Sequence, residues 1–452
     1  MGDAKKSEFL GTMPLGRLIF KLALPASVAL FANSAYNLVD TIFVGQGVGA
    51  LAIGAVALLF PFRIVVMSFG NLFGIGGASV VSRAMGAGSF DRARDAAGSA
   101  LGAAAIVGIL IGVFGSLFTP ALVRVLGGTG ELYGPTYEYT RIIVLSEPFL
   151  CFNFAANFLI RAEGRARAAM LALTSGIVLN IILDPIFIFA FDWGIGGAAL
   201  ATLFGHMLSS AIAVVYFVRA RGVLRIRLRS LVPRWRHLSE TLAVGVSGFV
   251  RQLSQGVVQV LRNNLLVVIG GSMAVSAVGV AFRTVLILAL PAMGVAQALP
   301  PIAGYNFGAG NAGRVRRSLG LAIGFTTLFT ATASLVLFLA PGAILRVFSD
   351  DAALLEQGAI FVRISAALLL FFPSYFIGGA FFQAIGQAGK AFVLALLRPG
   401  IGLVGMLIAA SLGSAAAVVA ADPISVIVGA AVVYFLVTSS FRNDKRLAVA
   451  PD

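Results

Sequence analysis

Residues 86–94 read GAGSFDRAR, and residues 308–316 read GAGNAGRVR, an offset of 222. Three more matches share this offset: Arg124-Val125 with Arg346-Val347, Arg141 with Arg363, and Ala162-x-Gly164 with Ala384-x-Gly386. Tyr216-Phe217 matches Tyr434-Phe435 at an offset of 218, which indicates a four-residue deletion late in the second half. Independent matches at one offset are hard to obtain by chance, so the chain is a duplication.

Both halves are too apolar for a soluble domain. Hydrophobic residues make up 59% of the 452-residue chain and charged residues 11%, and the mean hydropathy is +0.99. We count about twelve apolar runs of about 20 residues, each long enough to cross a hydrocarbon core about 30 Å thick as a helix. The sequence therefore predicts an all-α integral membrane protein with about twelve transmembrane helices.

The duplication organises these helices into two pseudo-symmetric six-helix bundles. An even number of spans per half gives both halves the same orientation, related by an axis along the membrane normal, with the ligand cavity between them. We place the lobes at residues 1–218 and 241–452. The basic segment 219–240, RARGVLRIRLRSLVPRWRHLSE, is expected to be a cytoplasmic connector along the lipid headgroups.

The net charge of +15 follows membrane topology. Of the 33 lysines and arginines, we assign 25 to alternate connections, Lys390 and Arg398 included, whereas the other connections carry only Arg124, Arg141, Arg346 and Arg363. By the positive-inside rule both termini are cytoplasmic, and we expect the cytoplasmic (inner) membrane as the location. The first span has no cleavage site before it and is expected to act as the insertion signal. The basic excess points to lipid headgroups and not to nucleic acid.

The sequence gives little support to several other classes of function. The one cysteine, Cys151, excludes an internal disulfide and a multi-cysteine metal site. His206 and His237 are the only histidines, and neither an HExxH motif nor a serine–histidine pair on facing spans is present, so we expect neither an enzyme nor a cofactor. A passive channel would not need carboxylates hidden in the spans.

Asp40 lies near the end of the first apolar span, in YNLVDTIFVG (36–45). An ionisable group inside a span costs about 2.5 to 3.5 kcal/mol, so it indicates function by default. Asn33, Tyr36 and Asn37 precede Asp40 at helical spacing and form a polar stripe on one face.

Asp184 is the second buried carboxylate, in GIVLNIILDPIFIFAF, with Asn180 one turn before it. Counted from the cytoplasmic ends at about 1.5 Å per residue, Asp40 and Asp184 both fall in the outer half of the bilayer and can meet. Pro185 has no backbone N–H, so it frees a carbonyl one turn earlier or kinks the helix.

Oxygen ligands from the sixth span can complete a cation site. In GIGGAALATLF, Thr202 offers a hydroxyl and Ala198 a backbone carbonyl. With the two carboxylates and the amide oxygen of Asn180 they form a hard-oxygen set suited to Na⁺. Two adjacent buried carboxylates can instead carry H⁺, since both cannot stay charged cheaply. The residues leave the choice of ion open.

Other polar residues in the spans are candidates for the cavity. Asn153 and Asn157 lie at i and i+4 and are expected to face the interior. Arg251, Arg262 and Arg283 are expected to face the cavity or its mouth, and the alternative is structural pairing with backbone carbonyls.

The remaining polar residues are read as structural. His206 is expected to be a satisfied structural histidine and not a proton relay. Glu163, beside three arginines, is expected to form a loop salt bridge, and Glu147 to lie at the outer interface. Pro25 is a kink point inside the first span.

With these residues in view, the chain resembles the multidrug and toxic compound extrusion (MATE) family, in its DinF-like and MepA-like branch. The resemblance covers nearly the whole chain and rests on YNLVDTIFVG (36–45), SRAMGAGSFDRA (82–93), RAEGRARAAM (161–170), LNIILDP (179–185), SGFVRQLSQG (247–256), GYNFGAGN (304–311) and FQAIGQAGKA (382–391). It implies a twelve-helix antiporter with two six-helix lobes around a central cavity, which exports drugs in exchange for Na⁺ or H⁺.

The resemblance also implies residue roles. Cation coupling in this branch matches Asp40, Asn180, Asp184, Thr202 and the carbonyl of Ala198, and Pro25 matches the bending proline of the first helix. Another branch places acidic coupling residues on spans seven and ten. Here those spans offer Arg251 and Gln252, and no acid lies between Glu240 and Asp350, so that mechanism is disfavoured.

We therefore expect a monomeric secondary active exporter that works by alternating access, taking H⁺ or Na⁺ in and lipophilic, often cationic, drugs out. Its expected partners are these small molecules, including toxic organic cations, the coupling ion and membrane lipids. The alternative is a lipid-linked oligosaccharide flippase of the same superfamily, for which Arg251 and Arg283 would be the anion-binding groups.

Overall fold

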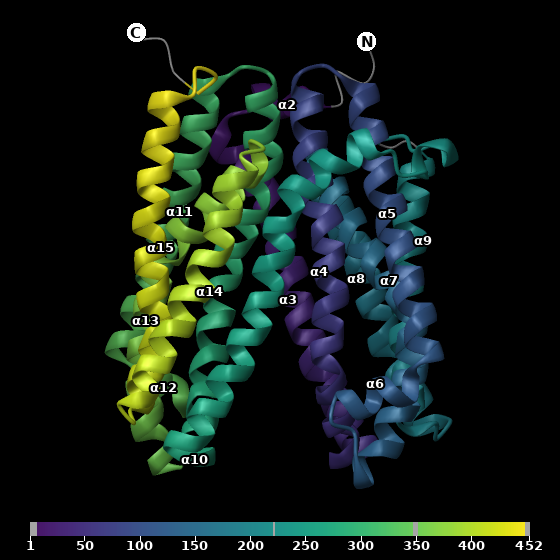
Figure 1. The fold of residues 1–452 in the computed structure, drawn as a ribbon, viewed down its shortest axis with the longest axis vertical. Helices are drawn as coiled ribbons and strands as arrows, with labels where there is room; N and C mark the ends of the chain where they lie inside the picture. The colour runs from purple at the N-terminus through teal and green to yellow at the C-terminus, as the bar shows by residue number, and fades with distance from the viewer. Residues whose placement is uncertain (1–6, 220–221, 347–350, 448–452) are drawn as a thin grey trace. The chain divides into compact units, whose positions relative to one another are not determined.

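The computed structural model describes residues 7–219, 222–346 and 351–447, and all regular secondary structure in these ranges is helical (Figure 1). The first half contains α2 (Phe9–Thr12), α3 (Leu15–Gly47), α4 (Ala50–Gly86), α5 (Phe90–Leu117), α6 (Thr119–Val125), the 3-10 turn η1 (Gly130–Leu132), α7 (Tyr133–Ala162), α8 (Ala166–Pro185), the π-helical turn η2 (Ile186–Ala190) and α9 (Gly194–Val218). The second half contains the 3-10 turn η3 (Leu228–Leu231), α10 (Trp235–Gly308), α11 (Ala312–Leu339), α12 (Pro341–Leu345), α13 (Ala352–Ala384), α14 (Ala388–Ser411) and α15 (Ala415–Asn443).

Eleven helices in the described ranges are long and apolar enough to cross a membrane. The long α10 is two helices, because Gly271 breaks it with a φ of 68°. Only its second part is among the eleven; the first part, residues 235–270, is more polar and includes Arg251 and Arg262. With this part as the twelfth span, the predicted all-α membrane architecture is confirmed.

The helix boundaries repeat at the offset found in the sequence. Helix α5 spans 90–117 and α11 spans 312–339, so both ends are 222 residues apart. Three pairs of glycines with positive φ also share this offset: Gly49 with Gly271, Gly88 with Gly310, and Gly164 with Gly386. A positive φ favours glycine. Because these glycines recur at the same offset, both halves interrupt their helices at matching positions. The structure confirms the duplication.

Two compact units divide the chain. Val28–Phe249 forms most of the first unit, and the second combines Leu10–Ser27 with the chain from Val250 onward. The chain therefore changes unit inside α3, two residues after Pro25, and again inside α10. The lobe boundaries at residues 218 and 241 stay a sequence-based prediction.

The connector packs closely against the first unit. A Cβ added at Gly102 on α5 would lie 1.7 Å from the carbonyl oxygen of Leu231, so only glycine allows this approach. Val223 and Leu224 are fully buried, whereas Trp235 is 73% exposed. Packing of small residues, and not only headgroup contact, holds this segment in place.

Glu163 fixes the start of the same segment. We expected a loop salt bridge, but Glu163 is buried and accepts hydrogen bonds from the Tyr216 hydroxyl and the Leu224 backbone N–H. The chain after α9 folds back over Glu163 and shields it from solvent, and the salt bridge to an arginine stays a prediction.

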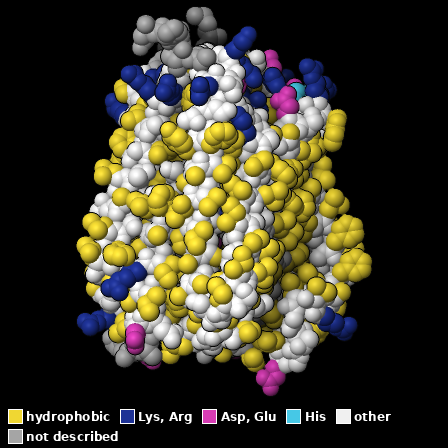
Figure 2. Space-filling model, turned by 60° about the vertical axis from the view of Figure 1, so that its left-hand side comes forward, with side chains coloured by type: hydrophobic (Ala, Val, Ile, Leu, Met, Phe, Trp, Pro, Cys, Tyr) yellow, Lys and Arg dark blue, Asp and Glu magenta, His cyan; other side chains and the backbone are white. Residues whose placement is uncertain are grey.

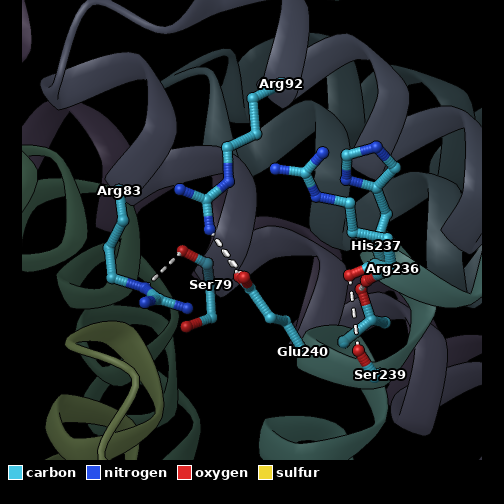
Figure 3. A network of polar contacts seen from close by, with 8 residues as sticks. Ser79, Arg83, Arg92, Arg236, His237, Ser239 and Glu240 are labelled. Carbon is cyan, nitrogen blue, oxygen red and sulfur yellow. Dashed lines mark hydrogen bonds and ion pairs between the residues drawn. The ribbon is translucent and has the colours of Figure 1, made fainter.

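Polar contacts tie the beginnings of α5 and α10 together, and Figure 3 shows the pair of Arg92 and Glu240. Arg92 Nη2 lies 2.7 Å from a carboxylate oxygen of Glu240. Asp95, one turn along α5, lies 3.9 Å from Arg234 and 4.0 Å from His237. These pairs are partly exposed, so each contributes little alone, but together they fix the register of α10 against α5.

The surface suits a lipid environment. Figure 2 shows hydrophobic side chains spread over the helices, while lysines and arginines gather near the helix ends.

One arginine departs from the predicted distribution. We placed Arg398 in a connection, but it lies inside α14 with its side chain only 16% exposed, beside Asp422. A buried acidic partner explains why this arginine is tolerated within a span.

Gly102→Ala tests the packing of the connector. The added methyl group would overlap the Leu231 carbonyl, and overpacking of this kind costs about 1–3 kcal/mol. Thermal unfolding of the detergent-purified protein should show a midpoint several degrees lower. Gly320→Ala on α11, where the methyl meets open space, is the matched control and should leave the midpoint nearly unchanged. Equal midpoints for both variants would contradict the packing account.

Candidate cation site in the first unit

Close packing of α8 on α9 creates the site. Gly176 on α8 and Gly205 on α9 face each other, and a Cβ on Gly176 would lie 2.3 Å from the Gly205 carbonyl oxygen. Small residues let membrane helices approach in this way. One turn from this contact, the Asn180 amide nitrogen on α8 is 3.4 Å from the Thr202 hydroxyl on α9.

The predicted coupling residues meet at this crossing. The Asn180 amide also donates to Asp184 Oδ1 at 3.4 Å, and Asn180, Asp184 and Thr202 are all at most 2% exposed. From α3, the Asp40 carboxyl lies close enough to interact electrostatically with that of Asp184, and Tyr36 lies beside Asp40 and Thr202. The structure therefore brings together five residues that the sequence analysis singled out on three helices.

Two oxygen atoms in this cluster are free to bind a cation. Asp184 Oδ2 and Asn180 Oδ1 are buried and have no hydrogen-bond partner among the described residues. An unsatisfied buried oxygen is costly, so such atoms usually mark a ligand position. One carboxylate and one amide oxygen, beside the Asp40 carboxyl, fit Na⁺ as transported cargo, and the carboxylates alone fit H⁺.

The helix irregularity predicted at Pro185 is present. α8 ends at Pro185, and the chain continues as the π-helical turn Ile186–Ala190. π-turns within helices often occur at functional sites. Asp184 thus lies where the backbone hydrogen bonding changes from the α-helical to the π-helical pattern. Ala198 is buried on α9, and the role of its carbonyl stays a prediction.

Sequence reasoning missed Arg63 on α4. Its Nη2 lies 3.3 Å from His206 Nε2, and its guanidinium interacts electrostatically with Glu147, Tyr139, Tyr36 and Asp40. Arg63 is a lone cation inside an apolar span, so the argument that singled out Asp40 applies to it equally.

Glu147 is not at an interface as we expected. It is 0% exposed, and both carboxylate oxygens lack a hydrogen-bond partner among the described residues. The expectation was wrong because α7 runs on through Pro148, and glycines on α5 let it pack closely: a Cβ on Gly108 would lie 2.8 Å from Pro148 Cα. Arg63 lies within electrostatic range of the Glu147 carboxyl.

A match to a protein-family model identifies the family of this chain. The family model MatE matches residues 25–186 and 249–408, which cover most of the chain as two copies. The chain belongs to the MatE family. Members of this family are transport proteins and not enzymes, and the sequence-based resemblance is confirmed.

Curated and solved relatives agree with the MatE assignment. The chain is 28% identical to the multidrug export protein MepA of Staphylococcus saprophyticus, over 87% of this chain and 85% of the relative, and 27% identical to that of Staphylococcus aureus, over 86% of each. Among solved structures, an outward-facing multidrug resistance MATE family transporter superposes with a TM-score of 0.89 at 26% identity, covering 97% of this chain and 99% of the other.

Other polar residues of this MatE chain link helices. The Asn153 amide donates to the backbone oxygen of His206 at 3.0 Å, and its Oδ1 accepts from Ser210 at 2.9 Å, which joins α7 to α9. The Asn157 amide donates to the Ala169 oxygen at 3.0 Å, which joins α7 to α8. Their predicted place in a substrate cavity stays a prediction.

The rest of the predicted cavity set lies on α3 and α10. Asn33 and Asn37 are exposed on α3, and the Asn37 amide donates to the backbone oxygen of Asn33. Arg251, Gln252 and Arg283 lie on α10 in the second unit, where Arg283 is exposed and the other two are half-buried.

A double-mutant cycle tests the Arg63–Glu147 pairing. Glu147→Gln removes the carboxyl that interacts electrostatically with the Arg63 guanidinium, and the loss of such an interaction at a buried site destabilises the folded protein. We expect this variant and Arg63→Gln each to lower the thermal midpoint strongly. The double variant should be more stable than the sum of the two losses predicts. Strictly additive losses would show that the two side chains do not interact.

Proposed function

We propose that this chain is a secondary active multidrug exporter that couples drug efflux to inward movement of H⁺ or Na⁺ by alternating access. One observation carries the proposal: Asp40 and Asp184 meet inside the apolar first unit, beside oxygen atoms that lack partners. The name of the MepA relatives supports multidrug compounds as the cargo. The proposed setting is the cytoplasmic membrane, with both termini in the cytoplasm and the protein acting as a monomer.

The carboxyl pair supplies the coupling. When a cation binds Asp40 and Asp184, it neutralises the negative charge that attracts a cationic drug, so drug affinity falls and the drug leaves outward. When the cation departs inward, the negative charge returns and the site can bind drug again. Exchange follows because each ligand weakens binding of the other.

The driving force is adequate for export. One charge moving through about 100 mV releases about 2.3 kcal/mol, which sustains a gradient of about 50-fold. If the drug is itself a monovalent cation, one-for-one exchange is electroneutral, and the chemical gradient of H⁺ or Na⁺ alone drives it. Two coupling ions per drug would restore dependence on voltage.

Prolines inside the helices provide positions at which α3 and α8 can bend. Pro25 lies inside α3, two residues before the chain passes from the second unit to the first. Proline removes a helix hydrogen bond and permits a bend at low cost. Since Asp40 lies on the same helix, a bend of α3 would alter the contact between Asp40 and Asp184. Pro185 would serve similarly beside the π-turn.

The lipid-linked oligosaccharide flippase is the less supported function. It requires no buried carboxyl pair, whereas this chain brings Asp40 and Asp184 together. The curated relatives with the MepA name are multidrug exporters.

Transport in proteoliposomes tests the proposal. Purified protein should move ethidium against its gradient when either a pH gradient without sodium or a sodium gradient at equal pH is imposed. The ion that works is the coupling ion. Asp40→Asn should reduce gradient-driven transport at least tenfold, because the coupling carboxyl is lost.

Asp192→Asn is the matched control. Asp192 is exposed in the turn before α9, with a φ of 54° that asparagine also adopts readily. The charge change is identical, and transport should stay near the wild-type rate. Transport that is insensitive to both gradients, or to Asp40→Asn, would reject the proposal.

A further inference from the structure

Glu147 on α7 is a buried acid that the proposed coupling does not use. Its side chain is 0% exposed, and neither carboxylate oxygen has a hydrogen-bond partner among the described residues. A buried carboxylate without hydrogen bonds is costly when it is charged, whereas the protonated acid costs much less. The charge of Glu147 therefore depends on the cations near it.

Arg63 on α4 is a cation that Glu147 shares with the coupling pair. Its guanidinium interacts electrostatically with Glu147 and also with Asp40. On its other side, Arg63 Nη2 lies 3.3 Å from His206 Nε2 of α9. Because a guanidinium can only donate, this nitrogen accepts, and the His206 ring is neutral. One guanidinium is thus shared between two acids, Asp40 and Glu147.

The other titratable groups near Glu147 are neutral at ordinary pH. Cys151 lies one turn after Glu147 on α7, Tyr139 lies about two turns before it, and both are buried. Helix α5 packs against the same part of α7 through glycine, since a Cβ on Gly108 would lie 3.1 Å from Cys151 Cβ. The charge balance at Glu147 is therefore set by the position of Arg63.

Glu147 lies deeper in the bundle than the coupling pair. A Cβ on Gly54, near the start of α4, would lie 3.0 Å from Leu132, so α7 begins at the side where α3 ends and α4 starts. Asp40 is seven residues from the end of α3, about 10 Å along the helix. Glu147 is fourteen residues from the start of α7, about 21 Å. Glu147 is thus about 10 Å closer to the proposed cytoplasmic side.

Two tyrosines are within range of both the coupling pair and Arg63. Tyr36 on α3 interacts electrostatically with Asp40, Asp184 and Arg63. Tyr139 on α7 interacts with the same three groups. A tyrosine hydroxyl both donates and accepts, so it can take a proton on its oxygen and pass on its own. These hydroxyls provide a route for protons, whereas they cannot pass on a sodium ion.

We propose that Glu147 is the acid that receives the coupling proton from Asp40 on its way to the cytoplasm. When Asp40 and Asp184 hold a proton, Arg63 is drawn to Glu147, which releases its own proton inward and stays as a carboxylate. The O–H bond of Asp40 then breaks, and a proton passes through a tyrosine hydroxyl to Glu147. Asp40 is charged again and attracts Arg63. One proton enters and one leaves in each cycle.

This inference rests on the proposed function and names H⁺ as its coupling ion. It gives Glu147 the role of a proton relay and Arg63 that of a positioning residue. The relay is needed only for net proton movement. Exchange of drug for drug across the membrane requires no proton release and should not depend on Glu147.

Two transport modes in proteoliposomes separate a relay from a structural role. One is ethidium movement driven by a pH gradient, and the other is exchange of labelled for unlabelled ethidium at equal pH. Glu147→Gln keeps the size of the side chain but cannot release a proton, so it should reduce gradient-driven transport about tenfold or more. Exchange should stay near the wild-type rate, and the ethidium dissociation constant should still rise as pH falls.

Further variants complete the test. Glu147→Asp keeps a titratable carboxyl but shortens the side chain, so it should retain more gradient-driven transport than Glu147→Gln; a packing role would give the reverse order. Glu138→Gln makes the same change at a half-buried acid of the same helix and should leave both modes unchanged. If Glu147→Gln does not fold, the double variant with Arg63→Gln, which removes both charges, replaces it with the same expectations.

Three results would overturn the inference. One is gradient-driven transport by Glu147→Gln at the wild-type rate. Another is a parallel loss of exchange and driven transport in that variant, which would make Glu147 structural. A third is a wild type that responds to a sodium gradient and not to a pH gradient, which would keep the proposed antiport but exclude the relay. A wild type that responds to neither gradient would reject the proposed function itself.

Discussion

The strongest constraint on the first unit is its pair of carboxyl groups, Asp40 and Asp184, which lie close together among apolar helices. Gly176 and Gly205 let α8 and α9 approach to backbone contact, which sets Asn180 against Thr202, and Asp40 from α3 lies beside Asp184 in the same cluster. Such a pair cannot stay doubly charged at low cost where one of its members is fully buried. The site therefore requires a cation, and that requirement is the physical origin of the proposed coupling.

The duplication gave each half the same helices but different charges. Helix ends and helix-breaking glycines recur at one offset, while the position of Asp40 is occupied by Arg262 in the second half. Backbone geometry depends on small residues and is preserved between the halves, whereas a single side chain can reverse the sign of a buried charge. The first unit thus has a pair of carboxyl groups, whereas the second has Arg262 and Arg398 around Asp422.

Sequence reasoning was most successful where the physical rule is local. Apolar length predicted the spans, and the cost of burying an acid identified Asp40 and Asp184. It failed where the partner is distant in sequence. Arg398 was misplaced because Asp422, which neutralises it, lies on another helix. The burial of Glu147 depends on glycines of α5, and its pairing with Arg63 depends on how α4 and α7 pack, which no local pattern reveals.

Competition between cation and drug tests the central claim most directly. The ethidium dissociation constant of the purified protein would be measured across pH without sodium, and across sodium concentration at fixed pH and ionic strength, for the wild type and for a variant with both Asp40→Asn and Asp184→Asn. The coupling ion should raise the wild-type constant at least tenfold and leave the variant's constant unchanged. A wild-type constant that is indifferent to both ions would contradict the proposed coupling.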